Sequence, residues 1–177
     1  RGLLVDQNDN LWVSTFGGLG FVENKEFLFE SRLQAVREGR PTCSVFAFSE
    51  TKEGDLWLGV EGIGLVNYDP VTEAFAAFDH CPAEQLGLNQ HRIRSIVDAN
   101  DGMLWLGSRW GFSSFDLETK IFSAHPLSFP GVVDQTRNPK IEFVPVRKLI
   151  MGKDANLWLA SSVGLVRYDT KQKSFEL

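Results

Sequence analysis

The sequence predicts an all-β protein made of four similar four-stranded antiparallel sheets. One observation is the composition, because 14 Phe, 5 Trp and 16 Gly in 177 residues favour strands and tight turns. A second is an internal repeat, in which a Leu-Trp pair recurs with 45, 48 and 53 residues between successive Trp residues. A third is the scarcity of helical periodicity, since only residues 33–38 are expected to form one or two helical turns.

Each copy of the repeat begins with an apolar run of strand length that leads into a polar turn. The apolar runs are residues 3–5, 45–48, 93–97 and 146–151. The turns are rich in Asp, Asn and Gly, which tolerate the backbone geometry of hairpin loops, and they comprise residues 8–10, 53–55, 101–103 and 154–156. The apolar run and the Leu-Trp segment are therefore expected to pair as the first two strands.

Two further strands are predicted after each Trp. A Gly that follows the Trp by six or seven residues marks the next loop: Gly18, Gly64, Gly111 and Gly164. The third strand is expected at residues 19–22, 65–68, 112–115 and 165–168, and an Asp closes it in three copies: Asp69, Asp116 and Asp169. A second turn then leads to a fourth strand that contains Phe27, Phe75, Phe122 or Phe175.

A four-stranded meander repeated at about 45 residues is typical of a β-propeller blade, because stacked blades bury both faces of each sheet. We therefore predict a β-propeller fragment of about four blades, at approximately residues 1–30, 43–80, 93–125 and 146–177. The repeated Trp side chains can fill the gaps between blades, and all four are expected to be buried: Trp12, Trp57, Trp105 and Trp158. Cys43 and Cys81 permit one disulfide, and two free thiols are the alternative.

The repeat resembles that of a known family. Its pattern has four elements in order: an Asp- and Gly-rich turn, Leu-Trp-[Leu/Val]-[Gly/Ser/Ala]-[Ser/Thr], a Gly-Leu pair and an aromatic-Asp pair. The pattern is fullest in residues 101–116 and 154–169. It closely resembles the two-component regulator propeller repeat. Members form periplasmic sensor regions, commonly two seven-bladed propellers followed by an immunoglobulin-like domain, a membrane span and a cytoplasmic kinase or diguanylate cyclase. The resemblance implies a noncatalytic periplasmic sensor segment of a bacterial signal transduction protein that detects a saccharide or another small molecule.

A propeller enzyme is the alternative, because virginiamycin B lyase and its relatives carry a similar repeat and a fold does not determine a function. The residues argue against catalysis, since His80, His91 and His125 are scattered through interblade segments and no triple has metal-ligand spacing. We expect no catalytic residue, no metal site and no cofactor. A plain protein-interaction scaffold is the third interpretation.

Charge and hydropathy argue against two classes of interaction, nucleic-acid binding and membrane insertion of this segment. The net charge is −5 and no basic run occurs, so nucleic acid is not expected to bind. No window approaches the roughly 18 apolar residues of a membrane span. Because the chain starts with Arg1, any signal peptide or membrane span is expected in flanking segments.

Ligand recognition is expected in loops that break the repeat. The loops between the second and third strands carry Phe16, Glu61 and the pair Arg109 and Trp110. A non-repeated Trp beside a cation can form a stacking platform with a hydrogen-bonding fork, as in the recognition of sugars. Packing of Trp110 between blades is the alternative.

A basic group is the second candidate site. It comprises His91, Arg92, Arg94 and Arg147, of which Arg94 and Arg147 both precede a repeat Trp by eleven residues. Convergence of these arginines at the mouth of a central channel would suit a carboxylate or an anionic sugar. Salt bridges between blades are the alternative, and residues 126–145 could cover this face as a lid or cross the surface.

The two end blades are expected to expose an apolar face each. Pairing of these faces between two chains would produce a homodimer or a larger assembly, and closure of the four blades upon themselves is the alternative. The expected contact residues at the two ends are Leu3, Val5, Leu11 and Val13, and Leu149, Met151, Leu157 and Leu159.

Overall fold

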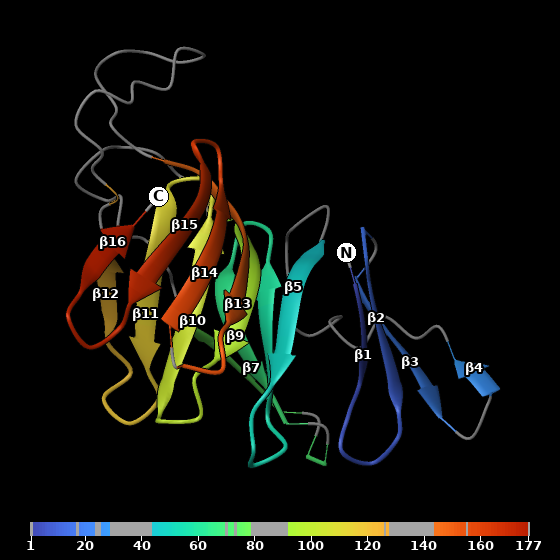
Figure 1. Cartoon of the computed structure of the whole chain (residues 1–177). Helices are drawn as coiled ribbons and strands as arrows, with labels where there is room; N and C mark the ends of the chain where they lie inside the picture. The colour runs from blue at the N-terminus through green and yellow to red at the C-terminus, as the bar shows by residue number, and fades with distance from the viewer. Residues whose placement is uncertain are drawn as a thin grey trace. The chain divides into compact units, whose positions relative to one another are not determined.

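The computed structural model describes residues 2–16, 18–23, 26–28, 44–69, 71–72, 74–78, 92–125, 127, 144–154 and 156–176. Over these residues the secondary structure consists of sixteen strands and no helix (Figure 1). Consequently no helix within the described ranges is long and apolar enough to cross a membrane. The helical turns expected at 33–38, and both cysteines, Cys43 and Cys81, lie outside the described residues.

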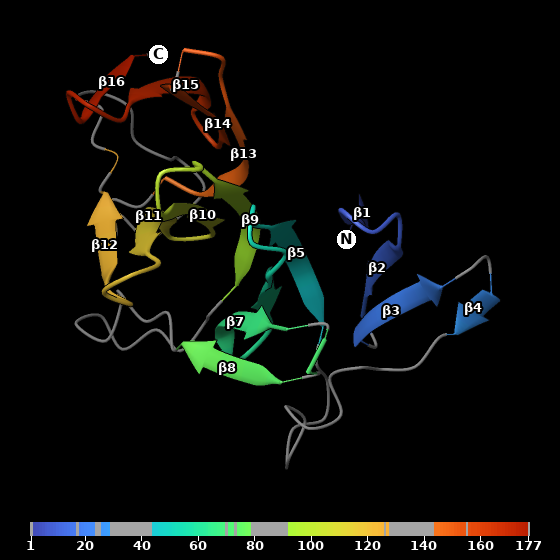
Figure 2. The ribbon, with the colours of Figure 1, turned by 90° about the horizontal axis from the view of Figure 1, so that it is seen from below.

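The strands form four separate antiparallel sheets, each a meander in which strands adjacent in sequence are hydrogen-bonded (Figure 2). We number these sheets as blades one to four. Blade one comprises β1 (Leu3–Val5), β2 (Leu11–Thr15), β3 (Gly18–Glu23) and β4 (Glu26–Leu28). Blade two comprises β5 (Val45–Glu50), β6 (Leu56–Val60), β7 (Gly64–Tyr68) and β8 (Phe75–Phe78).

Blade three comprises β9 (Ile93–Asp98), β10 (Met103–Ser108), β11 (Gly111–Asp116) and β12 (Phe122–His125). Blade four comprises β13 (Val146–Met151), β14 (Asn156–Ser161), β15 (Gly164–Asp169) and β16 (Ser174–Glu176). Every Leu-Trp pair lies on the second strand of its blade. The predicted all-β architecture of four four-stranded blades is thus confirmed.

The first turn of blade one is organised by the carboxylate of Asp6. It accepts hydrogen bonds from the backbone N–H groups of Asn8 and Asn10 at 2.9 Å and from Trp12 Nε1 at 2.8 Å. Burial alone would raise the pKa of Asp6, but the hydrogen bonds from Trp12, Asn10 and Asn8 outweigh it and lower the pKa. Asp6 therefore stays ionised and holds both the turn and the Trp12 indole.

In blades two, three and four, the turn before the fourth strand is organised by an Asp at the end of the third strand. Asp116 Oδ1 accepts hydrogen bonds from the backbone N–H groups of Thr119 and Glu118 at 2.9 Å, which lower its pKa. The equivalent Asp69 and Asp169 accept hydrogen bonds from the N–H groups two and three residues ahead. The expected turn role of these aspartates is confirmed.

The chain divides into two compact units, Arg1–Ile96 and Val97–Leu177. In the first unit, Trp12 of blade one meets Tyr68 of blade two edge to face, with ring centroids 5.7 Å apart and an interplanar angle of 76°. Tyr68 in turn stacks on Phe75 at 4.7 Å. These rings join Leu19, Leu56 and other buried aliphatic residues in one apolar core between the two sheets.

The second unit repeats this contact. Trp105 of blade three meets Tyr168 of blade four edge to face, at 5.5 Å and 67°. Phe112 packs against Tyr168 at 4.9 Å, and the His125 ring lies 5.0 Å from that of Trp105. A strand-two Trp packed on the strand-three Tyr of the following blade is thus the shared feature of the two units.

Trp158 differs from the prediction. It is 38% exposed, whereas Trp12, Trp57 and Trp105 are 2%, 2% and 6% exposed. Side chains alternate between the two faces of a strand, and blade four packs within its unit through the face that carries Leu157.

The expected contact residues on blade four were therefore assigned to the wrong face. Leu149, Leu157 and Leu159 are buried and Met151 is half-buried, while Ile150 and Leu165 are exposed. At the other end, Leu3 and Val5 are exposed and Leu11 and Val13 are half-buried.

His125 links the two blades of the second unit. It is the last residue of β12, not part of a connecting segment. Its Nε2 atom lies 2.9 Å from Ser114 Oγ and its Nδ1 atom lies 3.3 Å from the Tyr168 hydroxyl. Burial lowers the pKa of His125 below its usual 6.5, and the positive charge of Lys173 lowers it further.

We expect His125 to make the stability of the protein depend on pH. The folded state favours neutral imidazole, so this contribution is complete above about pH 6.5 and is lost as the pH falls through 6.5 towards the lower pKa of the folded state. Urea unfolding between about pH 7.5 and about pH 5.5 should show a steeper loss of stability for the natural protein than for His125→Gln. Identical pH slopes would contradict this role.

Candidate functional site

The loops between the second and third strands of blades one, three and four share one closing hydrogen bond. A hydroxyl at the end of the second strand donates a hydrogen bond to the carbonyl of the Gly that opens the third, from Thr15 at 3.1 Å, Ser108 at 3.2 Å and Ser161 at 2.7 Å. These glycines, and Gly64 in blade two, have positive φ, which explains why Gly recurs there. The repeat thus closes the loops, and their remaining side chains are free to vary.

Ser44 connects two of these loops in the first unit. Its hydroxyl donates a hydrogen bond to the Phe16 carbonyl at 3.1 Å, and its own carbonyl accepts one from the Glu61 N–H at 2.9 Å. Ser44 is buried. In the second unit Pro145 also precedes a first strand, and its carbonyl accepts a hydrogen bond from the Ser162 N–H at 3.0 Å. Ser44 was not among the residues predicted from the sequence, although its place just before β5 matches that of Pro145 before β13.

Glu61 and Arg92 form an ion pair with a nitrogen-to-oxygen distance of 2.5 Å, and their side chains are 26% and 39% exposed. The guanidinium carbon of Arg92 lies 5.7 Å from the centre of the Phe46 ring, within the range of a cation–π interaction. The salt bridge considered as the alternative for Arg92 is therefore present. Glu61 neutralises this cation, so Arg92 does not offer an isolated positive charge to a ligand.

The predicted site residues Phe16, Glu61 and Arg92 are thus connected to one another through Ser44 and Phe46. We call these five residues the Ser44 cluster. Phe16 is 60% exposed, so its ring offers an apolar surface to solvent. The paired side chains of Glu61 and Arg92 supply hydrogen-bond acceptors and donors with no net charge. An aromatic surface and balanced polar groups suit a neutral ligand that carries hydroxyl groups.

Arg109 and Trp110 form a separate group in the second unit. The Arg109 guanidinium carbon lies 5.7 Å from the centre of the Trp110 ring, and both residues are half-buried. The backbone N–H of Trp110 donates a hydrogen bond to Ser108 Oγ at 3.1 Å. Arg109 Nε is buried without a hydrogen-bond partner in the structure, which carries a desolvation cost. The guanidinium thus lies within cation–π range of the Trp110 ring, and the role of the pair as a stacking platform for a ligand stays a prediction.

The remaining basic residues occupy equivalent positions on first strands. Arg94 is half-buried on β9, and Arg147 is exposed on β13 where the pairing register shifts between Val146 and Lys148. Phe46 is the third equivalent residue, and the register of blade two shifts there as well. Such a bulge redirects a side chain. Convergence of Arg92, Arg94 and Arg147 stays a prediction.

Two expectations concern other parts of the chain. His91 and most of the connection at 126–145 lie outside the described residues. Within the described ranges, no group of three or more His, Cys, Asp or Glu side chains is placed to hold a metal ion.

We expect Ser44 to stabilise the loops that it connects. Ser44→Ala removes the part-buried hydrogen bond from the Ser44 hydroxyl to the Phe16 carbonyl, so the unfolding free energy should fall by about 1 kcal/mol. Ser123→Ala is the matched control, since Ser123 is exposed on β12 and should change stability by less than about 0.5 kcal/mol. Urea unfolding measures both, and equal effects would contradict the role of Ser44.

Comparison with known proteins identifies similar folds. Neither a protein-family model nor a curated protein sequence matches the chain. The extracellular domain of a protein described as a hybrid two-component system of B. thetaiotaomicron matches 98% of the chain with a TM-score of 0.71 and 19% identity. The extracellular domain of a protein described as a one-component system of the same organism matches 94% of the chain, with a TM-score of 0.72 and 18% identity.

Catalytically inactive virginiamycin B lyase from Staphylococcus aureus, solved with quinupristin, matches 98% of the chain with a TM-score of 0.69 and 14% identity. The chain spans 22% and 21% of the two extracellular domains and 53% of the lyase. At these identities the comparisons establish the fold, that of a propeller-like protein.

Proposed function

We propose that the chain is a noncatalytic, ligand-binding part of an extracytoplasmic sensor in a bacterial signal transduction protein of the two-component type. The resemblance of its repeat to the two-component regulator propeller repeat supports this role. Two solved structures with the same fold are extracellular domains of proteins described as one- and two-component systems. In this proposal the domain lies in the periplasm and acts on a cytoplasmic output domain, such as a histidine kinase or a diguanylate cyclase.

The Ser44 cluster is the observation that carries the ligand-binding part of this proposal. Its exposed Phe16 can stack on the apolar face of a sugar ring, and the Glu61–Arg92 pair can accept and donate hydrogen bonds to hydroxyl groups. Because Glu61 neutralises Arg92, the cluster favours a neutral saccharide over the carboxylate or anionic sugar expected from the arginines alone.

Arg109 and Trp110 offer a second surface of the same chemical type. The Trp110 ring with the Arg109 guanidinium 5.7 Å from its centre presents a flat apolar surface beside hydrogen-bond donors. The donor of Arg109 that lacks a partner would gain one if a ligand oxygen or a rearranged side chain approached it. We assign this pair a supporting role in recognition.

Lyase activity is the second candidate function, because a virginiamycin B lyase solved with quinupristin and a streptogramin B lyase share the fold. Incubation of the purified protein with quinupristin, followed by mass spectrometry, tests it directly. Turnover of quinupristin would replace the noncatalytic proposal.

The ligand proposal is tested by calorimetric titration with a panel of neutral disaccharides and of disaccharides that contain a uronic acid. We expect a neutral disaccharide to bind the natural protein, and Arg92→Gln to weaken that binding at least tenfold. Glu61→Gln leaves Arg92 without its counter-charge, so the preference should shift towards the uronic acids.

Lys153→Gln serves as the control for a change of charge, since Lys153 is exposed in the first turn of blade four. It should leave the affinity unchanged. Failure of the whole panel to bind, or an equal loss of affinity in all three variants, would count against the Ser44 cluster as the binding site.

A further inference from the structure

One polar contact recurs between equivalent positions of consecutive repeats. It joins the residue four positions after a repeat Trp to the residue thirteen positions before the next repeat Trp. In the first instance the Ser44 hydroxyl donates a hydrogen bond to the Phe16 carbonyl. In the second instance Arg92 forms its ion pair with Glu61. In both, the chain supplies a polar partner for the loop between the second and third strands.

The third instance of this contact lacks a pairing group. Arg109 and Pro145 hold the two equivalent positions in the second unit. The segments that carry them still lie together, because a Cβ atom added to Gly111 would stand 3.9 Å from the Val144 carbonyl oxygen. A proline side chain has neither a charge nor a hydrogen-bond acceptor. Arg109 is thus left without the counter-charge that Glu61 receives at the same position of blade two.

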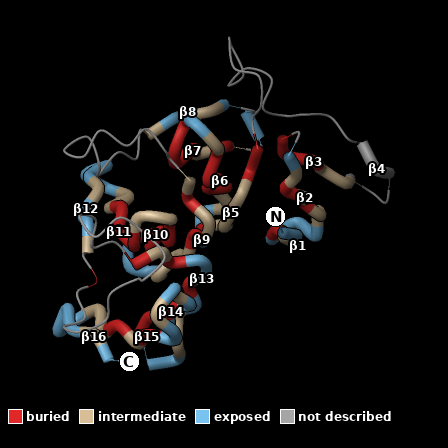
Figure 3. Tube along the Cα trace, turned by 90° about the horizontal axis from the view of Figure 1, so that it is seen from above, coloured by how far each residue is buried: buried red, intermediate tan, exposed pale blue. Residues whose placement is uncertain are grey.

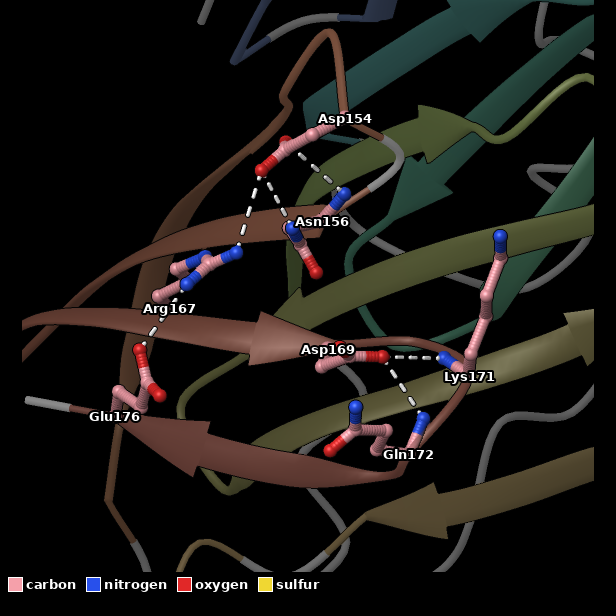
Figure 4. A network of polar contacts seen from close by, with 7 residues as sticks. All are labelled: Asp154, Asn156, Arg167, Asp169, Lys171, Gln172 and Glu176. Carbon is pink, nitrogen blue, oxygen red and sulfur yellow. Dashed lines mark hydrogen bonds and ion pairs between the residues drawn. The ribbon is translucent and has the colours of Figure 1, made fainter.

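Arg109 differs in this respect from Arg167 of the same unit. The Arg109 Nε atom is buried without a hydrogen bond, and among the residues that the structure describes no carboxylate lies within ion-pair distance of Arg109. Arg167, in contrast, contacts Glu176 at 3.1 Å and Asp154 at 3.4 Å, as Figure 4 shows. A partly desolvated cation gains more from a counter-charge than an exposed one, because water and salt screen it less.

The loop that carries Arg109 is closed by its own hydrogen bonds. It joins β10 and β11, whose residues are mostly buried (Figure 3). Ser108 Oγ accepts a hydrogen bond from the Trp110 backbone N–H and donates one to the Gly111 carbonyl. The Arg109 guanidinium carbon lies 5.7 Å from the centre of the Trp110 ring. The pair can therefore offer a planar fork to a carboxylate and an apolar surface to the group that carries it.

We propose that Arg109 is a carboxylate-binding site, in which a ligand carboxylate pairs with the guanidinium as Glu61 pairs with Arg92. The carboxylate is carried by a uronic acid or by a free small acid, and the probes below distinguish these two sources. The inference rests on the supporting role in recognition proposed for Arg109 and Trp110, and it names the ligand chemistry of that role. It does not depend on the Ser44 cluster, which favours a neutral saccharide.

Fluorine NMR of the full chain labelled with 5-fluorotryptophan tests the site. The Trp110 resonance, assigned with Trp110→Phe, should shift saturably with D-glucuronate and stay in place with D-glucose at the same concentration and ionic strength. Arg109→Gln should weaken the binding of glucuronate at least tenfold. Lys171→Gln removes an exposed positive charge from the same unit and should leave the binding unchanged. A response to acetate equal to that to glucuronate would assign the site to free small acids, and a weaker response would assign it to uronic acids.

Pro145→Glu gives a second test that leaves the arginine in place. The new carboxylate supplies the missing counter-charge, so glucuronate should bind at least tenfold more weakly than to Pro145→Gln, the uncharged control of the same size. A Trp110 resonance that glucuronate does not shift, an unchanged affinity in Arg109→Gln, or equal affinities in the two Pro145 variants would overturn the proposal. The binding of neutral disaccharides is measured separately by calorimetry, so a failure at one site is distinguished from a failure at the other.

Discussion

The edge-to-face contact between a strand-two tryptophan and the strand-three tyrosine of the next sheet is the interaction on which the rest of the structure depends. Twisted sheets diverge as they stack, and only large side chains fill the space between them. Trp12 with Tyr68, and Trp105 with Tyr168, do so in the two units with nearly the same centroid distance. These rings fix the spacing of the two sheets, which allows neighbouring groups such as His125 to form hydrogen bonds across the interface.

The loops that form the candidate site depend on this framework. Ser44 can join the loops of blades one and two because the sheets that carry them are packed together through Trp12 and Tyr68. The Gly with positive φ recurs in all four of these loops and the closing hydroxyl bond in three of them, so the loops can carry different side chains without loss of shape. We therefore propose that recognition lies with residues that differ between blades, such as Phe16 and Glu61, and stability with residues that recur.

Much of the fold could be predicted from the sequence because each blade repeats the same local signals. The roles of the Asp at the end of the third strand and of the Gly with positive φ are local to one turn, so they can be predicted without knowing how neighbouring sheets pack. The exposure of Trp158 could not be predicted, since the repeat does not indicate which face of a given sheet is covered. The Glu61–Arg92 ion pair could be given only as an alternative, because its formation depends on contacts outside the repeat pattern. The only sign of Ser44 in the sequence was its position just before a first strand, which it shares with Pro145.

The central claim is tested most directly by a double-mutant cycle on Trp105 and Tyr168 in the second unit. Urea unfolding of Trp105→Leu, Tyr168→Leu and the double variant measures how strongly the two side chains are coupled. We predict a coupling free energy of about 0.5–1.5 kcal/mol, the range expected for an aromatic pair beyond its buried area. Additivity within about 0.3 kcal/mol would show that the two rings contribute independently, and would contradict the account.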